Sequence, residues 1–321
     1  MKHKVLLIGL GQVGMGYDFD VADPGVVSSH AKAFASHPDF ELAGGVDPDA
    51  GACERFSERY GGWAGSDLAE GLSQVRPDVV VVASPTQYHA EAVRLVLCHA
   101  KPKLILCEKP LAYSLEEAQS MVVACREADC LLYVNYLRRV EPGVLEIKRR
   151  LEDGSIATPV KGVLWYTKGL LHNGSHFSNL LEFWLGPIEA FKIINSGRAW
   201  ADEDIEPDVQ VKFTAGEVSF LAAKEEHFSH HEIQLVAPNG CLRYEQGGAK
   251  ILWQAAASDP DFPEYTVLSL PGEKIATEGP RLQWHVADNV SACLRGKPSS
   301  LCSGDAALQT LESLLKMKAA L

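Results

Sequence analysis

The segment LLHNGSHFSNLL, residues 170–181, contains side chains that could carry out three different kinds of chemistry. His172 and His176 stand about one helical turn apart, the spacing of two metal ligands on one helix face. Asn173-Gly174-Ser175 is an acceptor triplet for N-glycosylation. A histidine can also be the base that takes a proton from an alcohol, because its pKa of about 6.5 lies near neutrality. The rest of the chain decides among these readings.

A second candidate is Lys109, in CEKPLA, which ends an apolar run typical of a buried strand. In an open α/β sheet, ligands bind outside the carboxyl ends of the strands, so a lysine there faces the ligand crevice. Its ammonium group would stabilise the alkoxide that develops when a histidine deprotonates a secondary alcohol. A bound cofactor would accept the hydride. Taken alone, Lys109 would be an ordinary surface residue before a turn proline.

A cofactor site is predicted by GLGQVG, which fits G-x-G-x-x-G directly after the first apolar run. Gly9 would allow a tight turn, Gly11 the approach of a pyrophosphate, and Gly14 close packing of helix on strand. The N–H groups of the following helix would bind the phosphates. We expect cofactor contacts from Gly9, Gly11, Gln12, Val13 and Gly14. The alternative is a glycine-rich turn with no ligand.

Asp47 is the acidic residue expected to bind the adenosine ribose. It stands further from Gly14 than the usual ~20 residues, which we attribute to an insertion around residues 17–29. A carboxylate at the end of the second strand would accept hydrogen bonds from the ribose hydroxyls and repel a 2′-phosphate. No Arg or Lys follows in DPDAGAC, so we predict NAD in preference to NADP.

The first part of the chain alternates apolar runs with helical patterns. Strands are predicted at residues 4–11, 40–47, 78–85, 103–110 and 131–137, and helices at 30–37, 50–60, 87–100 and 114–128. The last of these helices opens with a capping box, Ser114 to Glu117. The alternation predicts a doubly wound parallel sheet, and we expect an N-terminal Rossmann domain over residues 1–137.

The pattern changes near residue 140. A helix at 142–152 precedes VKGVLWYTKG, and strands are predicted at 188–194, 208–213, 217–223, 231–237, 241–245, 249–254 and 265–270. Such close spacing predicts a large, mostly antiparallel open sheet. Two helices follow, at about 281–296 and 304–320. We therefore expect a C-terminal α/β domain over residues 138–321, whose last helix can pack back toward the first domain.

The composition disfavours several kinds of partner. Of 321 residues, 46% are hydrophobic and 22% charged, and the net charge is −12, which opposes binding to nucleic acid and anionic membranes. No apolar stretch approaches the ~20 residues that span a bilayer. The eight cysteines include no C-x-x-C pair, and no signal-peptide core is present. We expect a cytoplasmic protein whose cysteines are reduced, small hydrophobes and whose Asn173 is not glycosylated.

Six motifs follow one another in a diagnostic order: GLGQVG, HAKAFASHPDFELAGGVDPD, ASPTQYHAEAV, CEKPLA, RRVEPGVLEIKRRLEDGSIATPVKGV and NGSHFSNLLEFWLGPIEA. Together they resemble the glucose–fructose oxidoreductase/inositol dehydrogenase (Gfo/Idh/MocA) family over nearly the whole chain. The resemblance implies an NAD-dependent oxidoreductase of carbohydrate metabolism. Its substrate would be a secondary alcohol or ketone of a sugar, polyol or nucleotide sugar.

The resemblance also implies roles for individual residues. Lys109 would polarise the substrate hydroxyl, with a cis bond to Pro110, and His176 would exchange the hydroxyl proton. Arg138 and Asn173 would join them at the substrate. The nicotinamide side would be lined by Ser84, Pro85, Thr86, His89, Glu108 and Lys109. The second domain would bind substrate and form a homodimer or homotetramer through the open face of its sheet.

The chain departs from the family at two positions. His172 stands where members carry an Asp four residues before the catalytic His, and Asn179 replaces a second Asp. His172 remains a catalytic candidate that can hydrogen-bond without negative charge, so a negatively charged substrate would not be repelled. LLHNGSH is similar to members that serve polysaccharide or nucleotide-sugar synthesis. A non-catalytic NAD-binding regulator is the alternative, and a dipicolinate-reductase-like enzyme fits these motifs less well.

The position at which the helix begins tests the hypothesis that His172 and His176 bind a metal together. Gly174 and Ser175 suit a helix entry, and the apolar spacing of FSNLLEFW starts only after them. We predict that the helix begins at 175 or 176 and leaves His172 in the preceding loop. No third ligand has suitable spacing, so we expect no metal. His230-His231 is predicted to lie at a strand edge or in a loop, outside the site.

Overall fold

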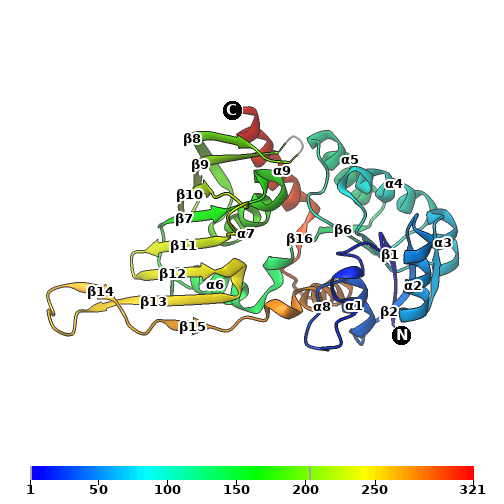
Figure 1. Ribbon diagram of the computed structural model, residues 1–321, viewed down its shortest axis with the longest axis horizontal. Helices are drawn as coiled ribbons and strands as arrows, with labels where there is room; N and C mark the ends of the chain where they lie inside the picture. Colours follow the sequence, from blue (N-terminus) through cyan, green and yellow to red (C-terminus); the bar gives the residue numbers. More distant parts are fainter. Residues whose placement is uncertain (1, 202–203) are drawn as a thin grey trace. The chain divides into compact units, whose positions relative to one another are not determined.

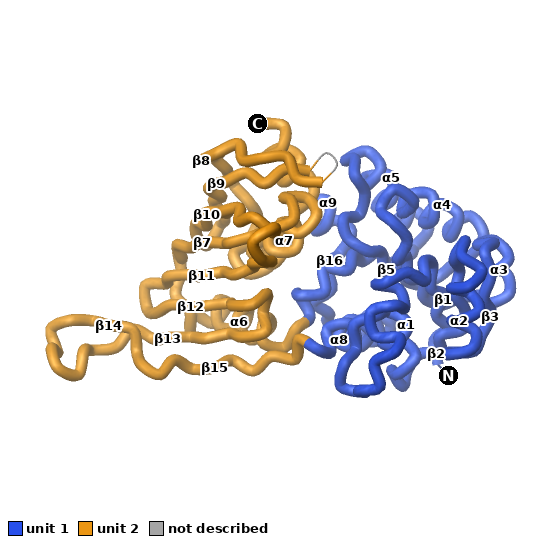
Figure 2. Tube along the Cα trace, in the orientation of Figure 1, with its two compact units in different colours: residues 1–140, 280–309 blue, residues 141–279, 310–321 orange. Residues whose placement is uncertain are grey.

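The computed structural model describes residues 2–201 and 204–321 (Figure 1). The chain divides into two compact units, each with its own sheet (Figure 2). Unit 1 comprises residues 1–140 and 280–309, and unit 2 comprises residues 141–279 and 310–321.

Unit 1 is built on a seven-stranded sheet of order β16-β6-β5-β4-β1-β2-β3. Every pairing in it is parallel except that of β16 with β6. The central strands are fully apolar because helices cover both of their faces. The bounds are β1 His3–Ile8, β2 Phe40–Val46, β3 Trp63–Gly65, β4 Val79–Val82, β5 Leu104–Cys107, β6 Leu131–Val134 and β16 Cys302–Ser303. The predicted Rossmann-type sheet is therefore confirmed.

Apart from α3, the helices of unit 1 follow the predicted positions closely. They are α1 His30–Ser36, α2 Ala50–Tyr60, α3 Leu68–Val75, α4 His89–His99, α5 Leu115–Glu127 and α8 Leu282–Leu294. Ser114 caps α5 as predicted, because its Oγ accepts a hydrogen bond from the N–H of Glu117 at 3.1 Å. The sequence missed β3 and α3, which are too short to show a periodic pattern.

The expected insertion interrupts a helix that begins in the glycine loop. The N–H of His30 donates to the carbonyl of Val13 at 3.1 Å, and the N–H of Ala31 donates to Gly14 at 2.9 Å. Residue 30 thus takes the position that residue 17 would hold in an uninterrupted helix. The extra distance to Asp47 comes from residues 17–29, as the sequence suggested.

A buried carboxylate fixes the insertion. Asp18 accepts hydrogen bonds from the N–H groups of Ser28 and Ser29 at 2.6 and 3.1 Å. The ammonium of Lys32 donates to the carbonyls of Val21 and Asp23, both at 3.0 Å. The insertion is an ordered loop held against α1.

Unit 2 is built on a nine-stranded sheet of order β14-β13-β12-β11-β7-β10-β9-β8, with β15 also paired to β13. All pairings are antiparallel except β7 with β10, in line with the predicted mostly antiparallel sheet. The strands are β7 Val160–Tyr166, β8 Ile188–Ala199, β9 Ile205–Phe213, β10 Gly216–Ala222, β11 Glu232–Ala237, β12 Gly240–Glu245, β13 Lys250–Ser258, β14 Thr266–Leu268 and β15 Glu273–Ile275.

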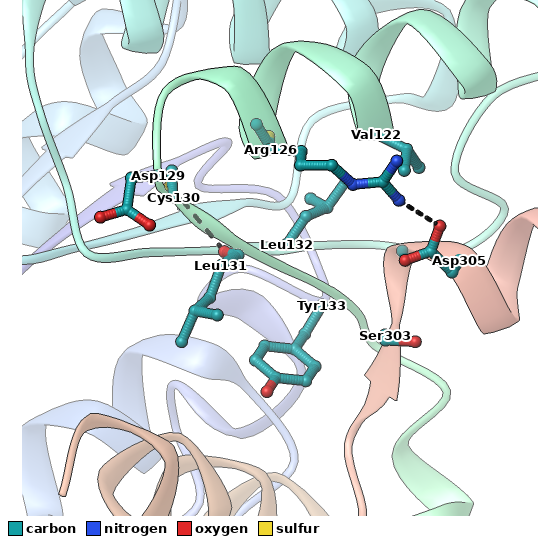
Figure 3. Close-up of a pocket in the computed structure, with 11 residues that line it drawn as sticks. Val122, Arg126, Asp129, Cys130, Leu131, Leu132, Tyr133, Ser303 and Asp305 are labelled. Carbon is teal, nitrogen blue, oxygen red and sulfur yellow. Dashed lines mark hydrogen bonds and ion pairs between the residues drawn. The ribbon is translucent and has the colours of Figure 1, made fainter. Parts of the chain in front are cut away.

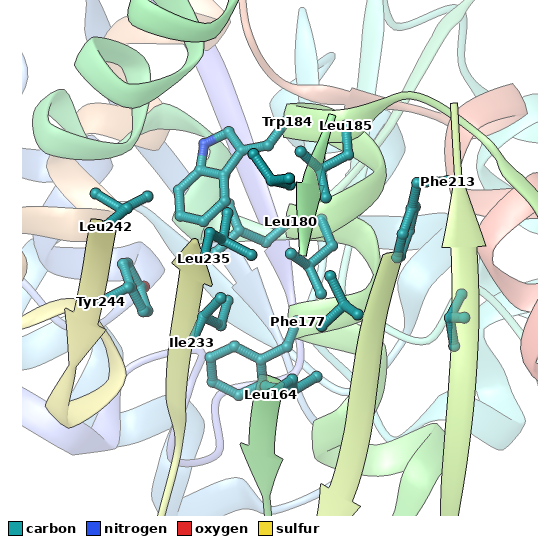
Figure 4. Close-up of a cluster of buried hydrophobic side chains, with 14 of the residues drawn as sticks. Leu164, Phe177, Leu180, Trp184, Leu185, Phe213, Ile233, Leu235, Leu242 and Tyr244 are labelled. Carbon is teal, nitrogen blue, oxygen red and sulfur yellow. The ribbon is translucent and has the colours of Figure 1, made fainter. Parts of the chain in front are cut away.

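Three helices contribute to the core of unit 2: α6 Pro142–Glu152, α7 Ser175–Leu185 and the end of α9 Gly304–Ala319. Figure 4 shows Phe177, Leu180 and Trp184 of α7 among side chains from the strands, including Leu164 and Leu235. No helix within the described residues is long and apolar enough to cross a membrane.

The division of the chain differs from the single boundary expected after residue 137. The chain leaves unit 1 at residue 140, but residues 280–309 return to it. Val286 and Val290 of α8 are buried in the same core as β1 and β4, and β16 extends the sheet beside β6. The last helix begins in unit 1 and ends in unit 2. Periodicity predicted the two helices, but it showed neither β16 nor the sheet against which α8 packs.

Candidate active site

The three loop glycines have three different surroundings. Gly9 has φ +93°, and a Cβ there would lie 2.6 Å from the Ala83 carbonyl carbon. A Cβ on Gly14 would overlap the carbonyl oxygen of Gly9. A Cβ on Gly11 would meet nothing within 4 Å. Gly9 and Gly14 are therefore required by the fold, whereas exposed Gly11 leaves open backbone to which a pyrophosphate could come close.

Asp47 is tied to the glycine loop. Its Oδ2 accepts a hydrogen bond from the N–H of Leu10 at 2.7 Å, and its Oδ1 accepts one from the N–H of Asp49 at 2.9 Å. The carboxylate is half-buried. Each carboxylate oxygen can accept more than one hydrogen bond, so the side chain can still bind ribose hydroxyls. The residues of unit 1 thus fit a dinucleotide.

The predicted nicotinamide residues of unit 1 gather at one edge of its sheet. Ser84, Pro85 and Thr86 follow β4, and Glu108 and Lys109 follow the neighbouring strand β5. The peptide bond between Lys109 and its proline is cis, as expected. Because carboxyl ends of parallel strands meet at one edge, residues from separate motifs become neighbours there. Arg138 lies half-buried in a 3₁₀ turn, Leu137–Val140, after β6.

Glu108 is the centre of a buried hydrogen-bond network. Its Oε1 accepts from Nε2 of His30 at 2.8 Å and from Nδ2 of Asn135 at 2.7 Å. Asn135 also donates to Gln283 of α8 at 3.3 Å. Burial opposes ionisation of Glu108, but the hydrogen bonds from His30 and Asn135 outweigh it and lower its pKa. A fixed negative charge therefore lies directly beside Lys109 in the chain.

The sequence did not single out His30, Asn135 or Gln283. They come from three separate segments of the chain, and although His30 opens one of the six motifs, no role was assigned to it. The only available signal was position, because His30 begins the first helix and Asn135 directly follows strand β6.

His89 is fully buried at the start of α4. Its Nε2 lies 2.9 Å from the carbonyl oxygen of Ser84 and its Nδ1 lies 3.2 Å from that of Leu111. Burial lowers its pKa, which favours the neutral ring. The structure therefore assigns His89 to holding the segments after β4 and β5 together. The expected nicotinamide contact gains no support from this position.

In unit 2, His172 and His176 lie on one helical path. α7 begins at Ser175, as predicted. The preceding residues, Gly169–Gly174, form a π-helical turn that runs directly into it, so the expectation of a loop around His172 was wrong. His176 is buried, whereas His172 is exposed with its ring 5.2 Å from that of Trp200. No cluster of three or more His, Cys, Asp or Glu residues suited to a metal occurs among residues 2–201 and 204–321.

Two carboxylates explain the π-helical turn. Asp204 accepts hydrogen bonds from the N–H groups of Leu171 at 3.1 Å and His172 at 2.9 Å. Glu206 accepts from the N–H of Lys168 at 2.9 Å. Free N–H groups at a helix start need such partners. The sequence could not show this, because both acids come from a later segment.

His231 contacts a predicted substrate residue. Its Nε2 accepts a hydrogen bond from Nδ2 of Asn173 at 2.5 Å and lies 3.1 Å from Oγ1 of Thr167. Its ring stacks on that of Phe177 with centroids 5.3 Å apart. His231 precedes strand β11, as expected, and its side chain also contacts Asn173, a residue that we predicted to lie at the substrate.

Asn179 belongs to the interior of unit 2. Its Nδ2 donates to Oγ1 of Thr310 at 2.9 Å, and Thr310 hydrogen-bonds to Glu182. Asn179 and Thr310 are buried. At this position an amide supplies the donor that Thr310 accepts, which an ionised Asp could not.

A parallel sheet with a glycine-rich turn after β1 and a carboxylate after β2 defines the class of dinucleotide-binding Rossmann proteins. Residues 4–136 match the family described as "Oxidoreductase family, NAD-binding Rossmann fold" (GFO_IDH_MocA). This match covers the part of the chain that holds the glycine loop and agrees with the family that the motifs resemble.

Curated relatives match part of the chain. Scyllo-inositol 2-dehydrogenase (NAD(+)) of Bacillus subtilis (strain 168) is 29% identical over 163 residues, 50% of this chain and 44% of that protein. D-xylose 1-dehydrogenase [NADP(+)] of Haloarcula marismortui is 32% identical over 94 residues, 29% of this chain and 26% of that protein. The chain thus spans less than half of these relatives' lengths.

A solved structure matches the whole chain. The WlbA dehydrogenase from Bordetella pertussis, in complex with NADH and UDP-GlcNAcA, has a TM-score of 0.76 at 20% identity, covering 100% of this chain and 97% of that one. At this identity the likeness establishes the fold.

Proposed function

We propose that the protein is an NAD-dependent oxidoreductase that moves a hydride between nicotinamide and a secondary alcohol or ketone of a sugar, polyol or nucleotide sugar. The observation that carries the proposal is the glycine loop, in which Gly11 is open while Asp47 is tied to the backbone of Leu10. An open loop backbone beside a fixed carboxylate suits the pyrophosphate and ribose of a dinucleotide.

NAD would supply the hydride acceptor, and the chain would supply position and charge. Lys109 would hold the substrate oxygen and stabilise negative charge on it. His176 would take or return the hydroxyl proton. Asn173, held by His231, and Arg138 would orient the substrate. The proposal requires Lys109 and His176 to act on the same bound alcohol.

A sugar-type substrate is supported by the names of the relatives, which include an inositol and a xylose dehydrogenase. NAD is proposed over NADP because a 2′-phosphate would meet the negative charge of Asp47. The NADP relative shows that both cofactors occur among similar proteins. A cytoplasmic location stays a prediction from the sequence.

An assay with a panel of sugars, polyols and sugar nucleotides tests the proposal. NAD or NADP is supplied, and absorbance of the reduced cofactor is followed in both directions. Turnover with at least one panel member is expected. Tight NAD binding without turnover on any member would instead favour the non-catalytic regulator, which the dehydrogenase relatives do not favour.

We also infer that the open face of the second sheet joins copies of the chain. Trp165 of β7, Ile194 of β8 and Val236 of β11 are large apolar residues exposed on these strands. Exposed apolar groups on a sheet face are typical of interfaces. Light scattering should show a dimer or tetramer that Trp165→Glu weakens, and a monomeric wild type would exclude this assembly.

A further inference from the structure

The turn between α5 and β6 is a Schellman motif. The N–H of Cys130 donates to the carbonyl of Cys125 at 2.9 Å, and the N–H of Asp129 donates to that of Arg126 at 3.2 Å. Asp129 has φ +53°, the left-handed conformation that ends such a helix. In this motif, the residue after the left-handed position commonly touches the residue five positions earlier. Here these two residues are Cys130 and Cys125.

The two thiols interact with each other. Their interaction lowers the pKa of the Cys125 thiol and raises that of the Cys130 thiol. Both side chains are reduced, and only 1% and 6% of Cys125 and Cys130 is exposed. A disulfide requires Cβ atoms about 4 Å apart. Because side chains at these two positions of a Schellman motif touch, little movement would bring their Cβ atoms to that distance.

A surface cavity leads to this pair. It has a volume of about 260 Å³, and both cysteines line it. Figure 3 shows Cys130 among the residues of its lining. Arg126 and Asp129, which are exposed, line it too, so the cavity opens to solvent. Arg126 is held at the rim by an ion pair with Asp305 at 2.8 Å. The cavity therefore offers a small reagent a route from solvent toward the two buried cysteines.

We propose that Cys125 and Cys130 form a reversible disulfide when a small organic disulfide enters this cavity. The Cys125 thiolate attacks one sulfur of the reagent, whose S–S bond breaks, and one thiolate leaves and takes up a proton. Cys130 then loses its proton and attacks the Cys125 sulfur, and the second reagent thiolate leaves. Two protein thiols are oxidised and one reagent disulfide is reduced to two thiols.

The experiment treats the native full chain with hydroxyethyl disulfide, alkylates the remaining thiols after denaturation, and digests with trypsin. Trypsin cuts after Arg126, between the two cysteines, so the new bond would join two peptides that separate on reduction. We expect this linked pair in the wild type and its loss in Cys125→Ser and Cys130→Ser. Cys98→Ser, which removes an exposed thiol of α4, should leave the link unchanged.

Cys98 also reports that the reagent is active, because an exposed thiol forms a mixed disulfide with it. Cys98 modified while Cys125 and Cys130 remain fully alkylated in the wild type would overturn the proposal. A disulfide that joins Cys125 or Cys130 to a different cysteine would also overturn the proposal. The wild-type result decides the question even where a serine variant fails to fold.

Discussion

Nε2 of His30 lies 2.8 Å from Oε1 of Glu108, which joins the first residue of α1 to the residue after β5. α1 resumes the helix of the glycine loop, and Glu108 directly precedes Lys109. This hydrogen bond therefore links the proposed phosphate-binding segment to the proposed catalytic lysine within unit 1.

Replacing Glu108 with Gln should lower stability in a pH-dependent way. Hydrogen bonding lowers the folded-state pKa of Glu108, so its ionised form stabilises the fold above the ordinary carboxyl pKa. That stabilisation is lost as pH falls through the lowered pKa. Denaturant unfolding should show a wild-type advantage of about 2 kcal/mol at neutral pH that shrinks in acid. Exposed Glu127→Gln is the control, and a pH-independent difference would contradict the argument.

Alanine should act differently at two loop glycines. At Gly14 the new methyl group would overlap the Gly9 carbonyl, so the variant should lose several kcal/mol of stability or fail to fold. At Gly11 the methyl group meets no protein atom, so thermal stability should change little. NAD affinity of Gly11→Ala, measured by calorimetry, should nevertheless fall at least about tenfold because the methyl group stands where the pyrophosphate approaches. Equal NAD affinity would place the cofactor elsewhere.

Asp47→Asn should weaken the preference for NAD. The amide oxygen of Asn can still accept the hydrogen bond from the N–H of Leu10. The substitution removes the negative charge of the side chain. The ratio of NADP to NAD affinity should rise about tenfold, a change of roughly 1.4 kcal/mol. Titrations with both cofactors measure it, with Asp49→Asn as a nearby control. An unchanged ratio would remove Asp47 from cofactor discrimination.

Lys109→Ala should abolish turnover while NAD still binds. Loss of the ammonium removes charge stabilisation worth about 10²–10³-fold in kcat. Lys103→Ala, at the other end of β5 and paired with Asp78 on the surface, is the matched control. Stopped-flow turnover together with NAD calorimetry separates chemistry from binding. Undiminished turnover in Lys109→Ala would refute the mechanism.

His176→Gln should lose activity most strongly in the pH range in which His176 would act as the base. The amide keeps a polar group of similar length but cannot exchange a proton. We expect kcat to fall about 10²–10⁴-fold, with loss of the corresponding limb of the pH–rate profile. A profile of unchanged shape would assign the proton transfer to another group, with His172 the next candidate to replace.

Local features were determined by the sequence alone. These features are the glycine turn after β1, the Ser114 cap and the limits of α2 and α6. Each depends on neighbouring residues, because turns, caps and helical periods form within a few positions. The sequence also showed the insertion at residues 17–29, because the distance from Gly14 to Asp47 exceeds the usual ~20 residues between the glycine loop and the acidic residue.

Tertiary structure decided the rest. It brought His30 and Asn135 onto Glu108, placed His231 on Asn173, bent residues 169–174 into a π-helical turn around Asp204, and returned residues 280–309 to the first sheet. Each of these outcomes depends on hydrogen bonds or buried contacts between residues far apart in the chain. A local pattern records which face of an element is apolar, but not which distant donor or surface will meet that face.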